Sequence, residues 1–292
     1  MTTRFTGFSL TASLAFACLQ APAAAESDLL SVAPACVPGA GISVAPRQAG
    51  PQLRHDHIRL ANWNIKKSSE IGWDQDLSVL TQEADLILLQ EATLERPVAV
   101  NGLEAHFGIF AAGYRTDTLT SGVMTLSRVP AAGKCALSHR EPWLRTPKAT
   151  AITHFPVDNG NNLLVINLHG VNFTFTARPL QQQLADIGTH IEQHQGPLIL
   201  AGDFNTWSDA RQAELGSLMS NYGLDSVTFT DDQRITVLDN PLDHILTRGL
   251  TVISSHTLAT GSSDHNGLVV TLSATVQPDP GQNQALAATG SE

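Results

Sequence analysis

Short apolar runs recur through most of the chain, and their length limits what it can fold into. Each run is of strand length and too short to cross a membrane as a helix. Between the runs, apolar residues at helical spacing lie at Trp73–Ala84 and Leu180–Ile191. Ser208 or Asp209 can cap a third helix that ends near Gly223. Interleaved strands and helices predict an α/β protein. The predicted strands are Ile58–Ile65, Leu86–Gln90, Gly122–Leu126, Ala149–Phe155, Leu163–Leu168, Leu198–Ala201, His244–Leu246 and Leu268–Leu272.

The first 25 residues differ in composition from the rest. Arg4 precedes a mostly apolar run from Phe5 to Leu19, and small residues follow at 21–25. This order is typical of a cleaved secretory signal peptide, here residues 1–25. A membrane anchor is the alternative, but the run is short for a span and lacks following basic residues. We therefore expect an exported protein, periplasmic or extracellular, with no membrane span after cleavage.

Proline and glycine mark both ends of the mature chain. Residues 26–56 are rich in both and show little periodicity, which predicts a flexible N-terminal segment. Residues 276–292 are predicted to be a flexible tail for the same reason. Residues 57–275 then form a single domain. A composition of 42% hydrophobic and 15% charged residues excludes a coiled coil or intrinsic disorder for most of the chain.

Two cysteines remain once the signal peptide is removed, Cys36 and Cys135. The exported compartment permits their oxidation to one disulfide. Two unpaired buried thiols are the alternative. Only the distance between the two Cα atoms can decide between them.

Polar residues of types that bind metals or transfer protons lie where the predicted strands end. They are Asn64, Gln90-Glu91, His169, Gly202–Asn205 and Asp264-His265. Any one of them alone is more simply explained as a turn residue, a helix cap or a satisfied polar group. Their joint occurrence predicts a cleft at the rim of a sheet that gathers them.

The order of these motifs resembles the endonuclease/exonuclease/phosphatase superfamily, and longer stretches resemble its YafD-like bacterial branch. The resemblance covers roughly residues 58–273 and implies a DNase I-like fold, a single-domain four-layer α/β/β/α sandwich. The motifs are Asn64, Gln90-Glu91, Arg145–Lys148, His169–Phe173, Ala201–Ser208, Pro241–Gly249 and Ser263–Leu268.

The resemblance also implies a metal site. Asn64, Glu91 and Asp264 supply hard oxygen donors, which suit Mg²⁺, or Mn²⁺ in its place, and not a structural zinc site. Abasic-site endonucleases carry an aspartate two residues after the asparagine, where this chain has Lys66. A second metal site at that position is therefore not expected.

The resemblance assigns roles to the remaining motif residues. Asp203 and Asn205 would position and activate the attacking water. His265 would contact the phosphate, with Asp243 orienting it and favouring its protonated form. His169 would be a second phosphate contact, although 121–123 offers no acid to pair with it. Arg145 or Lys148 could neutralise developing charge.

Together these observations predict a secreted, metal-dependent phosphodiester hydrolase, with a nuclease as the leading interpretation. The alternatives are a lipid or inositol phosphate phosphodiesterase of the same superfamily and a catalytically silent phosphate-binding protein. The net charge of −10 argues against tight, nonspecific binding to a polyanion. This net charge is compatible with an enzyme that binds nucleic acid through a metal ion. We expect a monomer whose partner is a phosphodiester substrate, nucleic acid first among the candidates.

Overall fold

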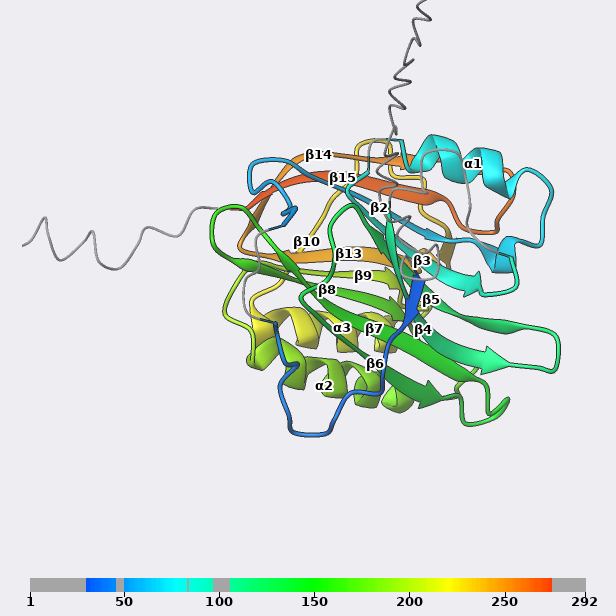
Figure 1. Cartoon of the computed structure of the whole chain (residues 1–292). Coiled ribbons are helices and arrows are strands. Elements are labelled where there is room, and N and C mark those ends of the chain that lie inside the picture. Colours follow the sequence, from blue (N-terminus) through cyan, green and yellow to red (C-terminus); the bar gives the residue numbers. More distant parts are fainter. Residues whose placement is uncertain (1–29, 46–49, 83, 97–105, 275–292) are drawn as a thin grey trace, which may run out of the picture.

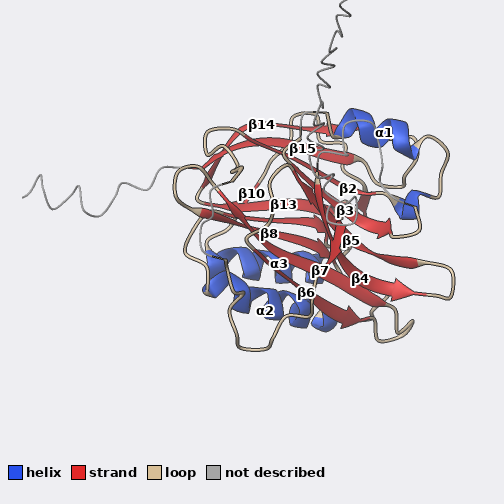
Figure 2. Ribbon diagram, viewed as in Figure 1, coloured by secondary structure: helices blue, strands red, loops and turns tan. Residues whose placement is uncertain are grey.

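The computed structural model describes residues 30–45, 50–82, 84–96 and 106–274. They form two packed β-sheets with helices on both outer faces (Figures 1 and 2). The helices are α1 (Trp73–Leu80), α2 (Arg178–Glu192), α3 (Asp209–Tyr222) and the 3-10 turn η2 (Lys66–Ser68). The strands are β1 (Leu30–Val32), β2 (Ile58–Asn64), β3 (Leu86–Thr93), β4 (Phe107–Arg115), β5 (Thr120–Ser127), β6 (Gly133–Arg140), β7 (Pro147–Pro156), β8 (Asn162–His169), β9 (Leu198–Asp203), β10 (Asp225–Ser226), β11 (Thr236–Val237), β12 (Asn240–Pro241), β13 (Asp243–Arg248), β14 (Leu250–Leu258) and β15 (Gly267–Ala274).

One sheet has seven strands in the order β1-β4-β5-β3-β2-β15-β14, and the other has six in the order β10-β13-β9-β8-β7-β6. Helix α1 covers the first sheet, and α2 and α3 cover the second (Figure 1). The layers are therefore α, β, β and α. This confirms the predicted four-layer sandwich, and β11 and β12 form a separate small ribbon.

Strand β8 shows why the central strands are apolar on both faces. Leu163 and Val165 belong to the core between the two sheets, whereas Leu164 and Ile166 belong to the core beneath α2 and α3. Successive side chains of a strand point to opposite faces. A strand buried on both faces therefore reads as a continuous apolar run, which is the pattern that the sequence displays.

All eight predicted strands and all three predicted helices are present, and α3 has Ser208 at its N-cap and Gly223 at its C-cap. The sequence analysis missed the longer strands β4, β6 and β14, and also the strands of two or three residues, β1, β10, β11 and β12. Strands β6 and β14 lie at sheet edges and are only partly buried, so their sequences are mixed rather than apolar. In β4 the buried run is short: it covers Gly108, Ile109, Phe110 and Ala111, and the last two residues of the strand are exposed.

Where the structure describes it, at residues 30–45 and 50–56, the N-terminal segment contradicts the prediction of a flexible segment over 26–56. Strand β1 pairs in parallel with β4, Ala35 forms a bridge with Ala136, and Leu53 forms one with Val157. Backbone hydrogen bonds and burial of Leu53 in the core between the sheets hold this proline-rich segment in place. Low periodicity was a poor guide because the segment docks through a few isolated contacts.

Cys36 and Cys135 form a disulfide with a Cα–Cα distance of 4.8 Å. The bond ties the N-terminal segment to β6 of the six-stranded sheet. Of the alternatives left by the sequence, the bridged one is present.

The predicted signal peptide and the predicted tail at 276–292 lie outside the described residues. Within the part of the chain that the structure describes, no helix has the length and apolar character needed to cross a membrane.

Replacing Cys36 and Cys135 with alanine should lower the free energy of unfolding. The bridge closes a loop with a sequence separation of 99, and removing such a crosslink typically destabilises a protein by about 2–4 kcal/mol. Denaturant unfolding of both proteins measures the difference. Mass spectrometry of the alkylated, unreduced protein should find no free thiol, and two alkylated cysteines would contradict the bridge.

Candidate active site

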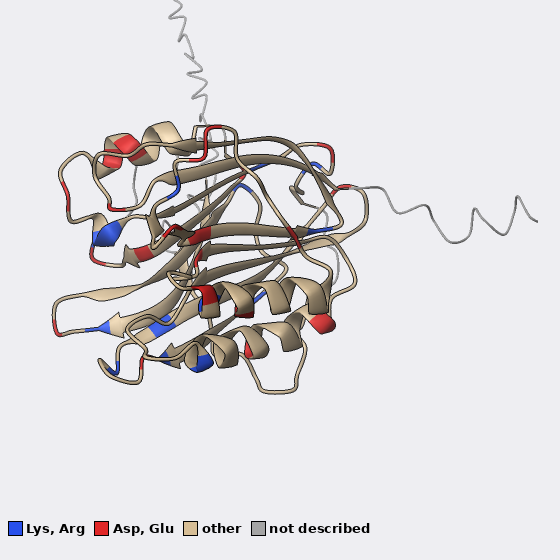
Figure 3. Cartoon of the chain, turned by 180° about the vertical axis from the view of Figure 1, so that it is seen from behind, with Lys and Arg blue, Asp and Glu red and all other residues tan. Residues whose placement is uncertain are grey.

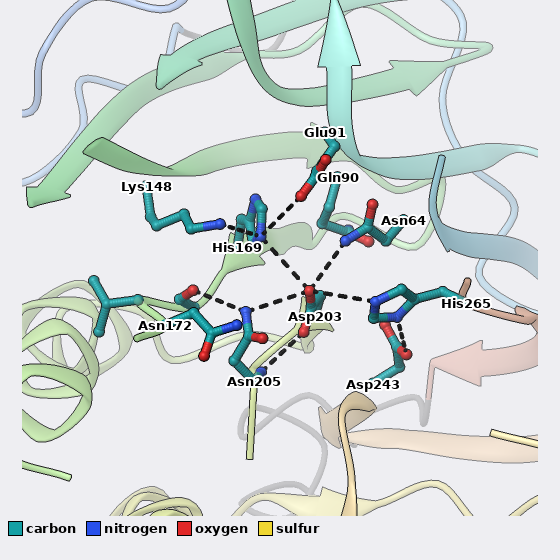
Figure 4. Close-up of polar contacts among 12 residues, drawn as sticks. Asn64, Gln90, Glu91, Lys148, His169, Asn172, Asp203, Asn205, Asp243 and His265 are labelled. Carbon is teal, nitrogen blue, oxygen red and sulfur yellow. Dashed lines mark hydrogen bonds and ion pairs between the residues drawn. The ribbon is translucent and has the colours of Figure 1, made fainter. Parts of the chain in front are cut away.

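The pairing of strands brings polar residues from both sheets to one edge of the sandwich (Figure 4). In the six-stranded sheet, His169 and Asp243 stand on either side of Asp203, from β8 and β13. In the seven-stranded sheet, Asn64 at the end of β2 lies beside Gln90 of β3. The side chain of Asn64 reaches Asp203, so the two sheets meet at this point.

Asp203 is the centre of the cluster and is 2% exposed. Its Oδ2 accepts hydrogen bonds from Asn64 Nδ2 at 3.0 Å and Asn205 Nδ2 at 3.3 Å, and its Oδ1 accepts the backbone N–H of Asn205 at 2.9 Å. The imidazole Nε2 atoms of His169 and His265 lie 3.6 and 3.9 Å from Oδ2. A single buried carboxylate thus faces two amides and two imidazoles.

Burial raises the pKa of Asp203 to about 6, although the positive charge of His265 opposes the rise. Loss of water penalises the charged form of a carboxylate, so the proton is held to a higher pH than usual. A carboxylate with a pKa near neutrality is suited to accept a proton during catalysis.

His265 is the cationic partner in the cluster. Its Nδ1 lies 2.7 Å from Asp243 Oδ2. Burial lowers the pKa of His265, but the charge and hydrogen bond of Asp243 and the charge of Asp203 outweigh this and raise it to about 10. The imidazole is therefore protonated at neutral pH, with Nδ1–H donating to Asp243 and Nε2–H directed toward the Asp203 side.

His169 has the opposite character. Burial and the charge of Lys148 lower its pKa well below the usual value, so the ring is neutral. Its Nε2 accepts a hydrogen bond from Lys148 Nζ at 2.8 Å. The Lys148 ammonium also lies 3.7 Å from Glu141, which is 1% exposed. The positive charge on this side of the cluster therefore belongs to Lys148 rather than to His169.

Backbone strain gathers around the same residues. Glu91 has a φ of 55° at the place where the pairing of β3 with β5 slips by a bulge, and Asn205 has a φ of 52°. Left-handed backbone at non-glycine residues costs about 1–3 kcal/mol and persists where the surroundings enforce it. Gly202 is required before Asp203, because a Cβ there would lie 1.9 Å from the carbonyl oxygen of Leu168.

The predicted metal ligands fit a hard cation. Asn64 Oδ1 accepts the backbone N–H of Lys66 at 3.1 Å, and the carboxylate of Glu91 is paired with the ammonium of Lys67. The Glu91 carboxylate is therefore already paired with one cation, the Lys67 ammonium, at the position where it would bind a divalent ion. Asp264 is exposed, and its charge helps to raise the pKa of His265. This all-oxygen donor set suits Mg²⁺ or Mn²⁺.

Asp203, Asp243 and His265 also bring potential ligand atoms within 4.8 Å of one another. The family resemblance predicts roles for this trio in proton transfer and phosphate contact. The Nδ1 of His265 and the Oδ2 of Asp243 are already bonded to each other, and both oxygens of Asp203 accept hydrogen bonds.

Polar contacts join eight of the ten predicted site residues, whereas Asp264 is exposed beside His265 in the chain and Arg145 lies apart from these contacts. Arg145 is exposed, and its backbone N–H donates to the carbonyl of Glu141. The sequence analysis missed Lys67, whose signal was its position three residues after Asn64. It also missed Glu141, which the linear pattern could not reveal because its partner Lys148 follows across a loop.

Two packed sheets with a carboxylate, amide and imidazole cluster at one edge define a DNase I-like phosphoesterase architecture. Residues 61–265 match the model of the endonuclease/exonuclease/phosphatase family. The chain belongs to this family, whose members are hydrolases acting on phosphoester bonds and are generally dependent on a divalent metal.

Individual relatives agree with this assignment. A UPF0294 protein of Yersinia pestis is 40% identical over 215 residues, which cover 73% of this chain and 82% of the relative. An endonuclease/exonuclease/phosphatase from Beutenbergia cavernae superimposes with a TM-score of 0.60 at 15% identity, over 75% of this chain and 72% of that one. D. rerio TDP2 complexed with single strand DNA product superimposes with a TM-score of 0.55 at 17% identity, over 74% and 98%.

Replacing Glu91 with alanine should weaken Mg²⁺ binding and leave the fold intact, because the side chain lies at the bulge of β3 and outside the apolar core. Calorimetric titration of Mg²⁺ into both proteins measures the change. Glu214→Ala on α3 is the matched control, since it also removes one carboxylate and should bind Mg²⁺ as the wild type does. Equal affinities in the Glu91 variant and the wild type would remove Glu91 from the metal site.

Proposed function

We propose that this protein is a metal-dependent phosphodiester hydrolase that acts on nucleic acid by in-line attack of water. The observation that carries the proposal is the buried carboxylate of Asp203, with its pKa near 6, facing a protonated imidazole that is oriented by Asp243. A protein that only binds phosphate needs cationic contacts but no buried proton acceptor. The arrangement therefore favours catalysis over silent binding.

The residues of the chain divide the reaction between them. Asp203 accepts the proton of the attacking water while an oxygen–phosphorus bond forms, and Asn205 holds the carboxylate in place. The bond to the leaving oxygen breaks, and that oxygen takes the electron pair. His265 and Lys148 place positive charge against the phosphoryl oxygens. When bound at Glu91 and Asn64, a divalent cation supplies Lewis acidity to the same group.

Nucleic acid is the proposed substrate class. The fold accommodates such a substrate, since the solved structure of D. rerio TDP2 with this fold contains a single strand DNA product. The acidic net charge of −10 is compatible with substrate binding through a divalent ion and a few cationic side chains. It disfavours nonspecific coating of long duplexes.

We further propose that the protein is exported and acts as a monomer in the periplasm or outside the cell. The signal-like order of residues 1–25 is one basis for this. The Cys36–Cys135 disulfide supports it, because such bonds persist mainly in oxidising compartments.

A turnover screen with Mg²⁺ tests the proposed function. The substrates are single-stranded DNA, duplex DNA, RNA, sphingomyelin and a chromogenic phosphodiester. Hydrolysis of a nucleic acid that stops on chelation of the metal is the expected result. Hydrolysis of sphingomyelin alone would contradict the proposed nuclease activity and indicate a lipid phosphodiesterase. Absence of turnover with all five substrates would contradict the proposed enzymatic activity.

Substitutions of Asp203 and of His265 should change kcat and KM in different ways. Asp203→Asn should lower kcat by roughly 10² or more with little change in KM, because it acts on the water only on the way to the transition state. His265→Ala should lower kcat and also raise KM, because it contacts the phosphate in both states. Asp243→Asn should resemble a milder His265→Ala. Steady-state kinetics decide this, and near-normal kcat in Asp203→Asn or wild-type behaviour in Asp243→Asn would contradict the roles assigned.

The pH dependence should report the same groups. Asp203 must be deprotonated to accept a proton, so kcat/KM should fall as pH drops below about 6, where its carboxylate takes up a proton. His265 keeps its proton up to about pH 10 and sets no limit near neutrality. A pH–rate profile on a chromogenic phosphodiester measures this. An acidic limb near pH 4, the ordinary range for aspartate, would show that burial does not control the proton acceptor.

A further inference from the structure

An aromatic pocket opens beside the active site, between the loop that precedes β7 and the loop that follows β8. It has a volume of about 610 Å³, and its walls are almost entirely apolar. Trp143 is 64% exposed, Phe173 61% and Phe175 81%. A cluster of large exposed aromatic side chains on one surface is characteristic of a binding site. We define the aromatic pocket by Trp143, Leu144, Asn172, Phe173, Phe175 and Trp207.

The aromatic pocket adjoins the reacting centre through both chain and contacts. Asn172 lies three residues after His169, and Trp207 lies two residues after Asn205. Three residues of extended chain span at most about 10 Å. The backbone N–H of Asn172 donates to Glu141 Oε1 at 3.0 Å, and the same carboxylate lies near Lys148. When the phosphate of a ligand is bound at the catalytic cluster, the part of the ligand next to that phosphate is therefore within reach of the pocket.

The pocket is built to present ring faces and an amide donor. Trp143 and Phe175 pack edge to face with centroids 4.5 Å apart, which leaves ring surface open to a ligand. Asn172 Oδ1 accepts the indole N–H of Trp207 at 3.0 Å and the backbone N–H of Phe173 at 2.8 Å. The Nδ2 of Asn172 makes no hydrogen bond with the described residues and can donate to a ligand. Phe173 is held in the left-handed region, with a φ of 48°, although its ring is exposed.

Two of the three loops that line the pocket are basic, whereas the third carries the exposed Asp209 two residues after Trp207. The loops 142–146 and 172–178 contain no acidic residue but include the exposed Arg145 and Arg178. Lys148 lies between this surface and the catalytic cluster. In Figure 3, basic positions lie at the ends of strands and at the start of α2, whereas α3 starts with an acidic position. The surface therefore complements a ligand that carries both anionic and apolar groups.

We propose that the aromatic pocket binds an unpaired nucleobase next to the scissile phosphate, so that the enzyme selects single-stranded nucleic acid. Single strands are bound by stacking of exposed bases on aromatic side chains beside a positively charged groove. A base in a duplex is stacked and paired, and cannot enter. The hollow shape and the free amide of Asn172 favour a base, whose edge accepts hydrogen bonds, over a lipid chain, which has no such acceptor. This inference rests on the proposed function and names its substrate class.

Binding can be measured without turnover in the full-length Asp203→Asn protein with Mg²⁺, by fluorescence anisotropy. The two probes are a labelled thymidine decamer and a decamer of abasic sites with the same number of phosphates. We expect the thymidine decamer to bind about tenfold more tightly, since stacking on an aromatic side chain accounts for a difference of that order. Adding Trp143→Ala or Phe175→Ala should abolish this preference and leave the affinity for the abasic decamer unchanged.

Two further variants separate the contributions. Arg145→Ala should weaken binding of both decamers equally, because a basic side chain contacts phosphate and not base. Ile253→Ala removes an equally exposed apolar side chain from β14, outside the pocket, and should change neither affinity. Thermal unfolding of each variant confirms that it is folded.

Equal affinity for the two decamers in the Asp203→Asn protein would overturn the inference. So would binding of neither decamer, together with Trp143-dependent binding of phosphatidylcholine and phosphatidylglycerol vesicles, which would assign the pocket to lipid. If the wild type hydrolyses a chromogenic phosphodiester but shows no base preference, the inference fails while the hydrolase stands. A base preference in a wild type that hydrolyses no phosphodiester would support the inference and contradict the proposed function.

Discussion

A hydrogen bond between two buried carboxamides joins the sheets of this protein across their apolar interior. Gln90 Nε2 donates to Asn167 Oδ1 at 2.7 Å, and both residues are fully buried. Asn167 in turn donates through Nδ2 to the backbone carbonyl of Met124 at 3.0 Å. Apolar packing alone is non-directional and allows the sheets to slide, whereas a buried hydrogen bond fixes their offset. Because Gln90 precedes Glu91 and Asn167 lies two residues before His169, this contact aligns the two halves of the active site.

The cluster at the aligned edge owes its chemistry to burial more than to any unusual residue. Burial raises the pKa of Asp203 and lowers that of His169, whereas the neighbouring carboxylates keep His265 charged. Groups of the same type are thus given different protonation states by their surroundings. The outcome is one carboxyl group with a pKa near neutrality, one cationic imidazole and one neutral imidazole in a single cluster. Strained backbone at Glu91 and Asn205 holds two of the functional side chains in place.

The aromatic pocket and the docked N-terminal segment both lie at the margins of the two sheets. The N-terminal segment adds a strand to the edge of one sheet and is tied to the other sheet by a disulfide, so it links both sheets from outside. The aromatic pocket stands on loops 142–146 and 172–178, where insertions and substitutions change specificity without disturbing the core. In general, loops beside a fixed sheet edge can change which ligand is bound while the fold is kept.

The sequence by itself determined the fold class and most of the site. Strand-length apolar runs revealed the doubly buried strands, and polar residues at their ends marked Asn64, Glu91, His169, Asp203 and His265, because strand ends in a sandwich share one rim. Tertiary structure decided what depends on contacts between distant segments. No periodic pattern in the sequence indicates the Cys36–Cys135 bond, the docking of residues 30–45 or the pairing of Lys148 with Glu141. The same holds for the aromatic pocket, whose side chains come from three separate loops. Protonation states belong to the same category, because a pKa follows from burial and neighbouring charge, which exist only once the chain has folded.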